Sequence, residues 1–269
     1  MKTDTKTSLF GVIGDPVSHS LSPVMHNRAF SEIGYNGIYM AFHVTDIESA
    51  IKGVKGLGIK GLSVTIPHKI SIMSFLDEID EMAEKIGAVN TVVNKEGKLF
   101  GYNTDCLGAI HALREKTEIK NKNILMIGAG GAARAIGFGI LSDGGNLTIV
   151  NILEDEGKVL SSILGVPYYH LSEFSRLEYD ILINTTPVGM SPETNKMPIE
   201  PDDLKPERIV MDIIYNPLKT MLMSESEKIG CSTVDGVSMF VHQGAAQFEM
   251  WTGKKAPVKI MRKAVLKEL

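Results

Sequence analysis

A glycine-rich segment in the middle of the chain could bind the pyrophosphate of a dinucleotide. Residues 124–133 read Ile-Leu-Met-Ile-Gly-Ala-Gly-Gly-Ala-Ala. A pyrophosphate must come close to backbone N–H groups at a helix N-terminus, and side chains would block that approach. Gly128 would make the tight turn and Gly130 would admit the phosphates, while Ala133 at the third position of the pattern still allows close packing of helix on strand.

The neighbouring sequence favours this interpretation over a plain glycine turn between a strand and a helix. An apolar strand at 124–127 precedes the glycines, helix-forming residues follow at 133–141, and a second apolar strand comes at 147–150. This order is typical of a βαβ unit. We therefore expect a dinucleotide pocket at the glycines.

Polar side chains gather where the predicted strands of the first hundred residues end. They are Ser18, His19, Ser20, Ser22, Thr65, His68, Lys69, Asn90, Thr91, Asn103, Thr104 and Asp105. Open α/β sheets bind ligands at the carboxyl ends of their strands, so these donors and acceptors could converge on a small polyhydroxylated acid. Taken singly, the serines could cap a helix and the asparagines could hold turns. Lys69 and Asp105 are the two for which we favour a role in chemistry.

The elements that must position these side chains alternate between strand and helix. Further strands are expected at residues 9–13, 38–43, 61–66, 181–184, 209–212 and 232–234, and further helices at 23–33, 47–57, 70–86 and, broken at Pro257, 239–269. Ser22 is expected to cap the helix that starts at Pro23, and a hairpin is expected to turn at 94–97.

These elements predict an α/β fold with two domains. A Rossmann-like nucleotide domain at 106–237 would be inserted into a discontinuous α/β substrate domain formed by 1–105 and 238–269. A chain of 269 residues is long enough for two such cores. Ligands commonly bind between domains, so we expect a cleft there.

Composition argues against several classes of function. The chain is 43% hydrophobic and 22% charged with a net charge of −4, which gives no general attraction to nucleic acid. Cys106 and Cys231 are widely spaced and the histidines lack ligand spacing, so we expect neither a metal site nor a disulfide. A polar N-terminus and the lack of a long apolar run predict a cytoplasmic enzyme with no membrane partner.

Seven motifs together resemble the shikimate dehydrogenase family. In chain order they are Ser18-His-Ser-Leu-Ser-Pro23, Val64-Thr-Ile-Pro-His-Lys69, Gly87-Ala-Val-Asn-Thr91, Tyr102-Asn-Thr-Asp105, Gly128-Ala-Gly-Gly-Ala132, Asn184-Thr-Thr-Pro187 and Asp235-Gly-Val-Ser-Met-Phe-Val-His-Gln243. They follow the family's order and spacing over essentially the whole chain. The resemblance implies reversible reduction of 3-dehydroshikimate to shikimate by a nicotinamide cofactor, a step in aromatic amino acid (chorismate) biosynthesis.

The resemblance also implies which residues bind the substrate and which act on it. The expected substrate ligands, the first two of them on the carboxylate, are Ser18, Ser20, Thr65, Asn90, Tyr215 and Gln243. Lys69 and Asp105 match the family's catalytic pair. Hydride arriving at a carbonyl carbon leaves an alkoxide, to which an ammonium supplies both a proton and positive charge, while a neighbouring carboxylate fixes the ammonium. We expect the pair to share the proton transfer.

A further set of residues matches the family's cofactor positions. They are Gly128, Ala129, Gly130, Gly131, Ala132, Asn151, Glu154, Glu81, Ile213, Gly236 and Met239. Ile213 and Met239 would suit a hydrophobic core equally well. Gly236 would suit a turn beside the cofactor, where a residue without Cβ is favoured.

Residues 151–156 depart from the family pattern. Members that use NADP carry Asn-Arg-Thr and a further arginine there, whereas this chain has Asn-Ile-Leu-Glu-Asp-Glu. Three carboxylates would repel a 2′-phosphate, and an acid suits the ribose 2′-hydroxyl of NAD, although the usual acid position is Asn151 and Glu154 lies one turn later. Asp155 and Glu156 could equally be solvated charges opening a helix, and Lys158 could partly restore phosphate binding. We expect use of NAD, or of both NAD and NADP, where the family default is NADP.

Two alternatives stay open at this point. One is a quinate/shikimate dehydrogenase that uses NAD, and the other is a dinucleotide-sensing module without catalysis, against which intact Lys69 and Asp105 argue. The expected partner is the small-molecule substrate alone, and the protein is expected to be a monomer or a homodimer.

Overall fold

The computed structural model describes residues 3–269, which divide into two compact units. The first unit contains the chain up to Thr104 together with Gln243–Glu268, and the second contains Asp105–His242. Helices α5 (Thr104–Arg114) and α9 (Gly236–Thr252) each carry residues of both units. The predicted boundaries at 105 and 238 therefore fall inside helices rather than in loops.

The first unit is built on a mixed sheet in the order β2-β1-β3-β5-β6-β4. β1 pairs in parallel with β2 and β3, β5 runs antiparallel to β3 and β6, and β4 joins β6 in parallel. Its strands are β1 (Ser8–Gly14), β2 (Gly37–His43), β3 (Gly61–Val64), β4 (Glu78–Ile79), β5 (Thr91–Lys95) and β6 (Lys98–Tyr102). The predicted hairpin at 94–97 is confirmed as the β5–β6 turn.

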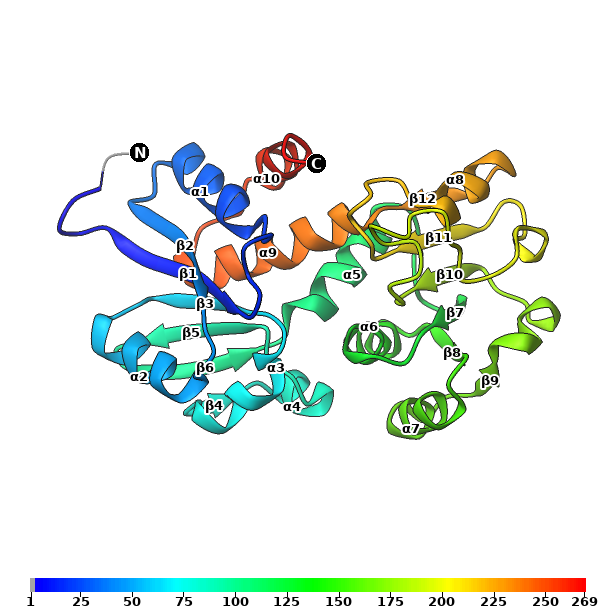
Figure 1. Ribbon diagram of the computed structural model, residues 1–269, viewed down its shortest axis with the longest axis horizontal. Helices are drawn as coiled ribbons and strands as arrows, with labels where there is room; N and C mark the ends of the chain where they lie inside the picture. The colour runs from blue at the N-terminus through cyan, green and yellow to red at the C-terminus, as the bar shows by residue number, and fades with distance from the viewer. Residues whose placement is uncertain (1–2) are drawn as a thin grey trace. The chain divides into compact units, whose positions relative to one another are not determined.

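Helices cover both faces of this sheet (Figure 1). The helices are α1 (Ser22–Ile33), α2 (Ile47–Leu57), α3 (His68–Ser71), α4 (Glu81–Ile86), the end of α9, and α10 (Val258–Leu266). Alternate residues of β1 face opposite layers: Phe10 packs against Phe30 of α1 and Trp251 of α9, whereas Ile13 shares a core cluster with Ile51 of α2. The sheet is thus buried on both sides.

The edge strand β2 is held by a side chain of α1. The amide of Asn27 accepts a hydrogen bond from the N–H of Tyr39 and donates one to its carbonyl, each at 2.8 Å. Because the N–H and C=O of one strand residue point to the same side, these bonds occupy the side of β2 that faces away from β1.

The single helix predicted at 70–86 is wrong. The segment forms α3, a 3₁₀ turn (Ile72–Phe75), the short strand β4 and then α4. The sheet edge causes the interruption, because the N–H groups of Asp77 and Asp80 donate to the carbonyls of Leu99 and Gly101 on β6. The Asp80 carboxylate then accepts the N–H of Met82 and starts a new helix.

The predicted cap of α1 is also different in the structure. Ser22 is the first residue of the helix, Leu21 precedes it without a side-chain cap, and the Ser22 N–H donates to Oγ of Ser20 at 3.3 Å. Proline next to the helix start supplies the fixed backbone angle instead.

The second unit is a fully parallel sheet in the order β12-β11-β10-β7-β8-β9. Numbered from its own first strand, this is the Rossmann order 6-5-4-1-2-3, with the reversal between β7 and β10. The strands are β7 (Asn123–Ile127), β8 (Asn146–Asn151), β9 (Tyr168–His170), β10 (Ile181–Asn184), β11 (Ile209–Asp212) and β12 (Ser232–Val234). The Rossmann-like prediction is confirmed.

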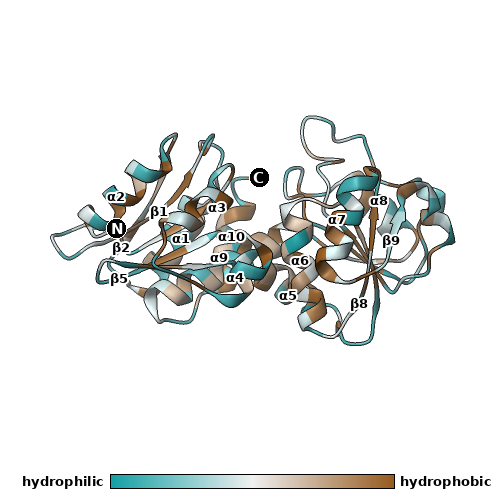
Figure 2. Ribbon diagram, turned by 90° about the horizontal axis from the view of Figure 1, so that it is seen from below, coloured by the Kyte–Doolittle hydropathy of each residue, from teal (hydrophilic) through white to brown (hydrophobic). Residues whose placement is uncertain are grey.

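Helices also flank this second sheet on both faces. They are α5, α6 (Gly131–Ser142), α7 (Glu154–Leu164) and α8 (Met221–Lys228), with 3₁₀ turns at Leu171–Arg176 and Pro201–Asp203. One core contains residues of α5, α6 and α7, and the other contains residues of α8 and of the turn after β9. In Figure 2 the strand β8 is predominantly brown, as expected for a sheet covered on both sides. None of the helices formed by residues 3–269 is long and apolar enough to cross a membrane.

Candidate active site

The glycine loop of the second unit leaves open space at the N-terminus of α6. Gly128 follows β7 with φ of 112°, and a Cβ there would lie 2.4 Å from Oγ1 of Thr185, so glycine is required by the protein itself. In contrast, apart from the adjoining residues and the backbone of α6 itself, no atom of the described chain lies within 4 Å of where a Cβ of Gly130 or Gly131 would stand. Packing therefore does not explain these two glycines. A ligand that approaches the backbone N–H groups would explain them, and an anionic pyrophosphate is a ligand of this kind.

Close packing behind the loop agrees with the third position of the pattern. Ala133 is fully buried in the core between α6 and the sheet. A Cβ on Gly137, one turn later, would lie 2.5 Å from a methyl group of Leu164. α6 therefore packs closely on α7, which carries Leu164, and on the sheet, where the same Cβ would lie 3.3 Å from a methyl group of Leu147 on β8.

The segment after β8 presents acids at the start of α7. Glu154, Asp155 and Glu156 are all exposed in its first turn. Nζ of Lys158 lies 2.6 Å from Oε1 of Glu154, and this ion pair lowers the pKa of Glu154 and raises that of Lys158. Asn151 is buried, and its amide donates to the carbonyl of Leu153 at 2.9 Å. Lys158, which was predicted to attract a phosphate, is thus already paired with a carboxylate.

Two other predicted cofactor residues of the second unit lie in its core. Met239 is buried in the cluster that contains Met211 and Val234, and Ile213 packs against the same cluster. Gly236 is required by close backbone approach, since a Cβ there would lie 2.4 Å from the carbonyl oxygens of Ile213 and Ile214. Their contacts with a cofactor stay predictions.

Tyr215 and Glu81 each belong to a different unit from most of the groups with which they were predicted to act. Tyr215, a predicted substrate ligand, belongs to the second unit, where its ring stacks on Phe240 and burial raises its pKa. Glu81, a predicted cofactor residue, belongs to the first unit and opens α4, where its exposed carboxylate pairs with Lys85 at 2.6 Å. Neither role is tested by these contacts.

A buried carboxyl that sequence reasoning missed stands at the end of β11. Asp212 is fully buried and accepts hydrogen bonds from the Thr220 hydroxyl at 2.7 Å, the Asn184 amide at 3.1 Å and the Ile214 N–H at 3.1 Å. Burial outweighs these donors and raises its pKa to about 6. Asp212 therefore ties the 213–220 loop to the ends of β10 and β11. Its position as the last residue of an apolar strand was the signal that the sequence offered.

In the first unit, a buried hydrogen-bond network surrounds Asn90. Its Oδ1 accepts the backbone N–H of Thr104 and the hydroxyl of Thr91, each at 2.7 Å. The Thr104 hydroxyl lies 3.2 Å from the same oxygen and 3.5 Å from Oε1 of Gln243. The structure thus brings together Asn90 and Gln243, two predicted substrate ligands, around Thr104. Thr104 immediately precedes Asp105, which lies half-buried in the first turn of α5.

The remaining predicted residues of the first unit follow β1 and β3 at their carboxyl ends. Ser18 is exposed and Ser20 half-buried in the loop after β1, while Thr65 follows β3 and its N–H donates to the Ile13 carbonyl of β1. Lys69 is half-buried in α3, and its carbonyl accepts the N–H of Val89 at 2.8 Å.

The buried ring of His68 fixes the start of α3, which carries Lys69. Its Nε2 lies 2.6 Å from the carbonyl of Val44, so this ring nitrogen carries the proton and donates it. The bond ties the first turn of α3 to the loop after β2. The backbone of Lys69 is thereby anchored on both sides.

Neither cysteines nor metal ligands provide another centre in the described chain. Cys106 and Cys231 are buried and unbridged, and burial, with Asp105 nearby, raises the pKa of the Cys106 thiol to about 11. Residues 3–269 contain no cluster of three or more His, Cys, Asp or Glu side chains that could hold a metal ion.

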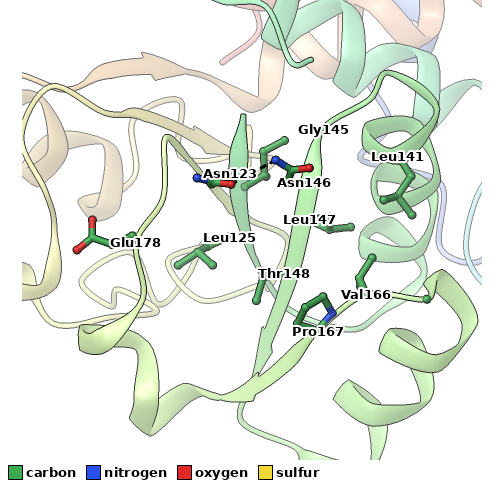
Figure 3. A pocket seen from close by; sticks show the side chains of 12 residues that line it. Asn123, Leu125, Leu141, Gly145, Asn146, Leu147, Thr148, Val166, Pro167 and Glu178 are labelled. Atoms are coloured by element: carbon green, nitrogen blue, oxygen red, sulfur yellow. Dashed lines mark hydrogen bonds between the residues drawn. The ribbon is translucent and has the colours of Figure 1, made fainter. Parts of the chain in front are cut away.

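A pocket of about 370 Å³ lies at the other end of the second sheet from the glycine loop (Figure 3). It is lined by the amino-terminal ends of β7 and β8, including Asn123 and Asn146, and by Val166, Pro167 and Glu178. None of the predicted site residues lines it. Parallel α/β sheets bind their ligands at the carboxyl ends of the strands, so this pocket is not the predicted site.

The fold and the glycine loop define a two-unit α/β protein with a Rossmann-like second unit. Residues 12–92 match the model of the shikimate dehydrogenase substrate binding domain, and residues 236–266 match that of the shikimate 5′-dehydrogenase C-terminal domain. A shikimate dehydrogenase (NADP(+)) of Methanococcus maripaludis is 48% identical over 97% of this chain and 98% of its own length. The chain belongs to the shikimate dehydrogenase family.

Solved structures agree with this assignment along the whole chain. A crystal structure of a shikimate dehydrogenase in complex with NADP+ has a TM-score of 0.92 and 42% identity, covering 99% of this chain and 97% of the other. The shikimate 5-dehydrogenase of Listeria monocytogenes in complex with shikimate and NAD also has a TM-score of 0.92, with 36% identity and 98% of both chains covered.

Proposed function

We propose that the protein is an oxidoreductase that interconverts shikimate and 3-dehydroshikimate with a nicotinamide dinucleotide, in the pathway to aromatic amino acids. The observation that carries the proposal is the 2.7 Å hydrogen bond from the Thr104 N–H to Asn90. It holds a predicted substrate ligand beside the residue that precedes Asp105, the predicted catalytic carboxylate. Family membership of the entire chain supports the choice of substrate.

The hydroxyls after β1 suit a carboxylate on the substrate. Oγ of Ser20 accepts the N–H of Ser22, so the Ser20 hydroxyl proton is available for donation. Ser18 is exposed on the same loop. Two O–H donors on one loop can each bind one carboxylate oxygen, with Thr65 at the end of the neighbouring strand.

Lys69 and Asp105 would transfer the proton to and from the substrate oxygen. When bound, the nicotinamide dinucleotide accepts the hydride from the substrate carbon in oxidation and returns it in reduction. In reduction, the Lys69 ammonium would protonate the oxygen that becomes the hydroxyl, and its charge would stabilise the developing alkoxide. Asp105 would hold the ammonium in place and share its proton, so that reduction starts from the protonated pair and oxidation from the deprotonated pair, which takes up the hydroxyl proton of the substrate.

The cofactor proposed is NAD, or both NAD and NADP. The support is the acidic first turn of α7, the absence of arginine from residues 151–158, and the pairing of Lys158 with Glu154. Because curated relatives carry NADP(+) in their names, the two cofactors must be compared directly. A preference for NADP of about a hundredfold, roughly 2.7 kcal/mol, would overturn this part of the proposal.

Initial rates of shikimate oxidation with NAD and NADP test the activity, with quinate as the second substrate. Lys69→Met should lose mainly kcat, because binding by the serines and Asn90 is retained. Lys60→Met, which changes an exposed lysine of the same unit, should behave as wild type. A Lys69→Met protein that keeps its turnover and loses only affinity would overturn the catalytic role. A wild-type protein that binds dinucleotide but oxidises neither substrate would favour the dinucleotide-sensing alternative.

Cofactor choice is tested by removing the carboxylate that pairs with Lys158. Glu154→Gln should raise kcat/KM for NADP severalfold relative to NAD, because Lys158 is released and one repelling charge is lost. Glu48→Gln is a matched control, since Glu48 also opens a helix and pairs with a lysine four residues on, at 2.7 Å, but in the first unit. An unchanged ratio in Glu154→Gln would show that the acidic turn does not face the ribose.

A further inference from the structure

The amide of Asn90 is the end of a longer buried network that the proposed chemistry does not use. The Tyr39 hydroxyl lies 2.6 Å from Oγ of Ser63, which lies 2.7 Å from Oε1 of Gln247 on α9. Nε2 of Gln247 lies 3.0 Å from the Thr91 hydroxyl and 3.3 Å from the carbonyl of Asn90. Every one of these side chains is less than a tenth exposed, so water cannot take over the bonds.

The direction of the network is fixed from its Asn90 end. The backbone N–H of Thr104 can only donate, so the atom of Asn90 that faces it must be the amide oxygen. That oxygen lies 2.7 Å from the Thr91 hydroxyl, whereas the Thr104 hydroxyl lies 3.1 Å from the hydroxyl of Thr91, so Thr91 donates its single proton across the shorter contact to Asn90. A reversed hydroxyl would bring two lone pairs into contact.

The donor and the acceptor of each remaining hydrogen bond follow in the same way. Because the Thr91 hydroxyl donates its proton to Asn90, its oxygen accepts a hydrogen bond from the amide nitrogen of Gln247. The Gln247 oxygen must then accept from Ser63, and Ser63 in turn accepts from Tyr39. Four side chains thus donate in one direction, from Tyr39 to Asn90, and this order determines the orientation of both amides.

We infer that Gln247 and Thr91 are positioning residues that fix the Asn90 amide with its nitrogen as the donor end, toward an oxygen of the substrate. The inference rests on the proposed function insofar as Asn90 is a substrate ligand. An Asn90 amide held this way selects an acceptor, such as a ring hydroxyl or carbonyl oxygen, and disfavours a ligand that offers only a donor there. Neither Gln247 nor Thr91 needs to contact the substrate for this effect.

Thr91 offers the sharpest test because two close substitutions separate shape from hydrogen bonding. Thr91→Val keeps the shape and removes the hydroxyl, and kcat/KM for shikimate should fall about tenfold, the effect of one lost buried hydrogen bond. Thr91→Ser keeps the hydroxyl and should restore most of the rate. In an Asn90→Ala background, Thr91→Val should change kcat/KM by less than about twofold, because its effect passes through Asn90. Independent, additive losses, or full activity in Thr91→Val, would overturn the inference.

Gln247→Met provides a second variant with the same expected pattern, in case Thr91→Val does not fold. Thr252→Val is the matched control on α9, since the Thr252 hydroxyl donates only to the Phe248 carbonyl of the same helix. It should alter stability but leave kcat/KM unchanged.

A measurement on the free protein separates this inference from the proposed function. In wild type, the side-chain NH₂ signals of Asn90 and Gln247, assigned by NMR with Asn90→Ala and Gln247→Met, should exchange slowly with solvent. Thr91→Val should shift the Asn90 signal and speed its exchange. An unmoved signal would overturn the positioning role even in an active enzyme. A moved signal in a protein that does not oxidise shikimate would instead overturn only the proposed function.

Discussion

Protonation of one buried histidine should decide how the first unit responds to acid. His26 of α1 is fully buried, and the side chain of Gln247 interacts with its ring, which raises its pKa by less than burial lowers it. Its ring stacks on Tyr39 at a centroid distance of 4.5 Å and lies 5.2 Å from the ring of Trp251. Burial lowers the pKa of His26 from 6.5 to about 3. The folded protein therefore keeps this ring neutral where the unfolded chain would charge it.

The sign and size of the effect follow from the two pKa values. Below pH 6.5 the unfolded chain binds a proton at His26 that the folded protein refuses until about pH 3, so the free energy of unfolding falls as pH falls through this window. The slope is at most about 1.4 kcal/mol per pH unit. Between pH 8 and pH 4 the loss attributable to His26 is therefore about 3 kcal/mol.

His26→Phe removes the titrating group and keeps an aromatic ring in the cluster. Urea unfolding can be followed by fluorescence of Trp251, the single tryptophan of the sequence. The free energy of unfolding of His26→Phe minus that of wild type should rise by about 3 kcal/mol from pH 8 to pH 4, whatever its constant offset from the larger ring. Ile72→Val, which changes a fully buried side chain that does not titrate, should show a flat difference. A flat difference for His26→Phe as well would refute the reasoning.

Two other variants test the burial of specific groups. In the folded protein the pKa of Asp212 is raised from 3.8 to about 6, so the free energy of unfolding falls as pH rises through this range. The free energy of unfolding of Asp212→Asn minus that of wild type should therefore rise by about 3 kcal/mol from pH 3 to pH 7. Unfolding curves at both pH values measure it, and equal differences would contradict the assigned pKa. Gly61→Ala places a Cβ 2.2 Å from Nε1 of Trp251, which donates to the Val92 carbonyl at 2.9 Å. Overpacking should cost about 1–3 kcal/mol and perturb Trp251 fluorescence, and a wild-type melting temperature would count against the packing described.

Sequence patterns predicted the second unit well because its elements are locally determined. The apolar runs of β10, β11 and β12 begin and end where predicted, since buried parallel strands are nearly continuous in hydrophobic residues. The glycine loop was readable because its requirement is local. Gly128 needs a positive φ, and Gly130 leaves space at a helix start.

Long-range contacts account for what sequence reasoning missed. The segment after Lys69 reads as one helix until β6 pairs with it, and nothing near Asp77 or Asp80 reveals that partner. Gln247 meets Ser63 across 184 positions of the chain and Thr91 across 156. The buried state of Asp212 likewise depends on Thr220 and Asn184, which only the folded sheet brings to it.

The two hydrogen bonds of Asn27 have a consequence for the self-association of this protein. An edge strand with free backbone groups is a template on which another chain can add a strand, which is a route to fibrous aggregation. Asn27 imitates that incoming strand at Tyr39, near the middle of β2, and belongs to the same molecule. A strand from another molecule would have to displace the side-chain amide of Asn27, which belongs to the same chain as β2. Asn27 thereby occupies backbone groups at the outer edge of the seven-residue strand β2 and disfavours pairing of that edge with another molecule.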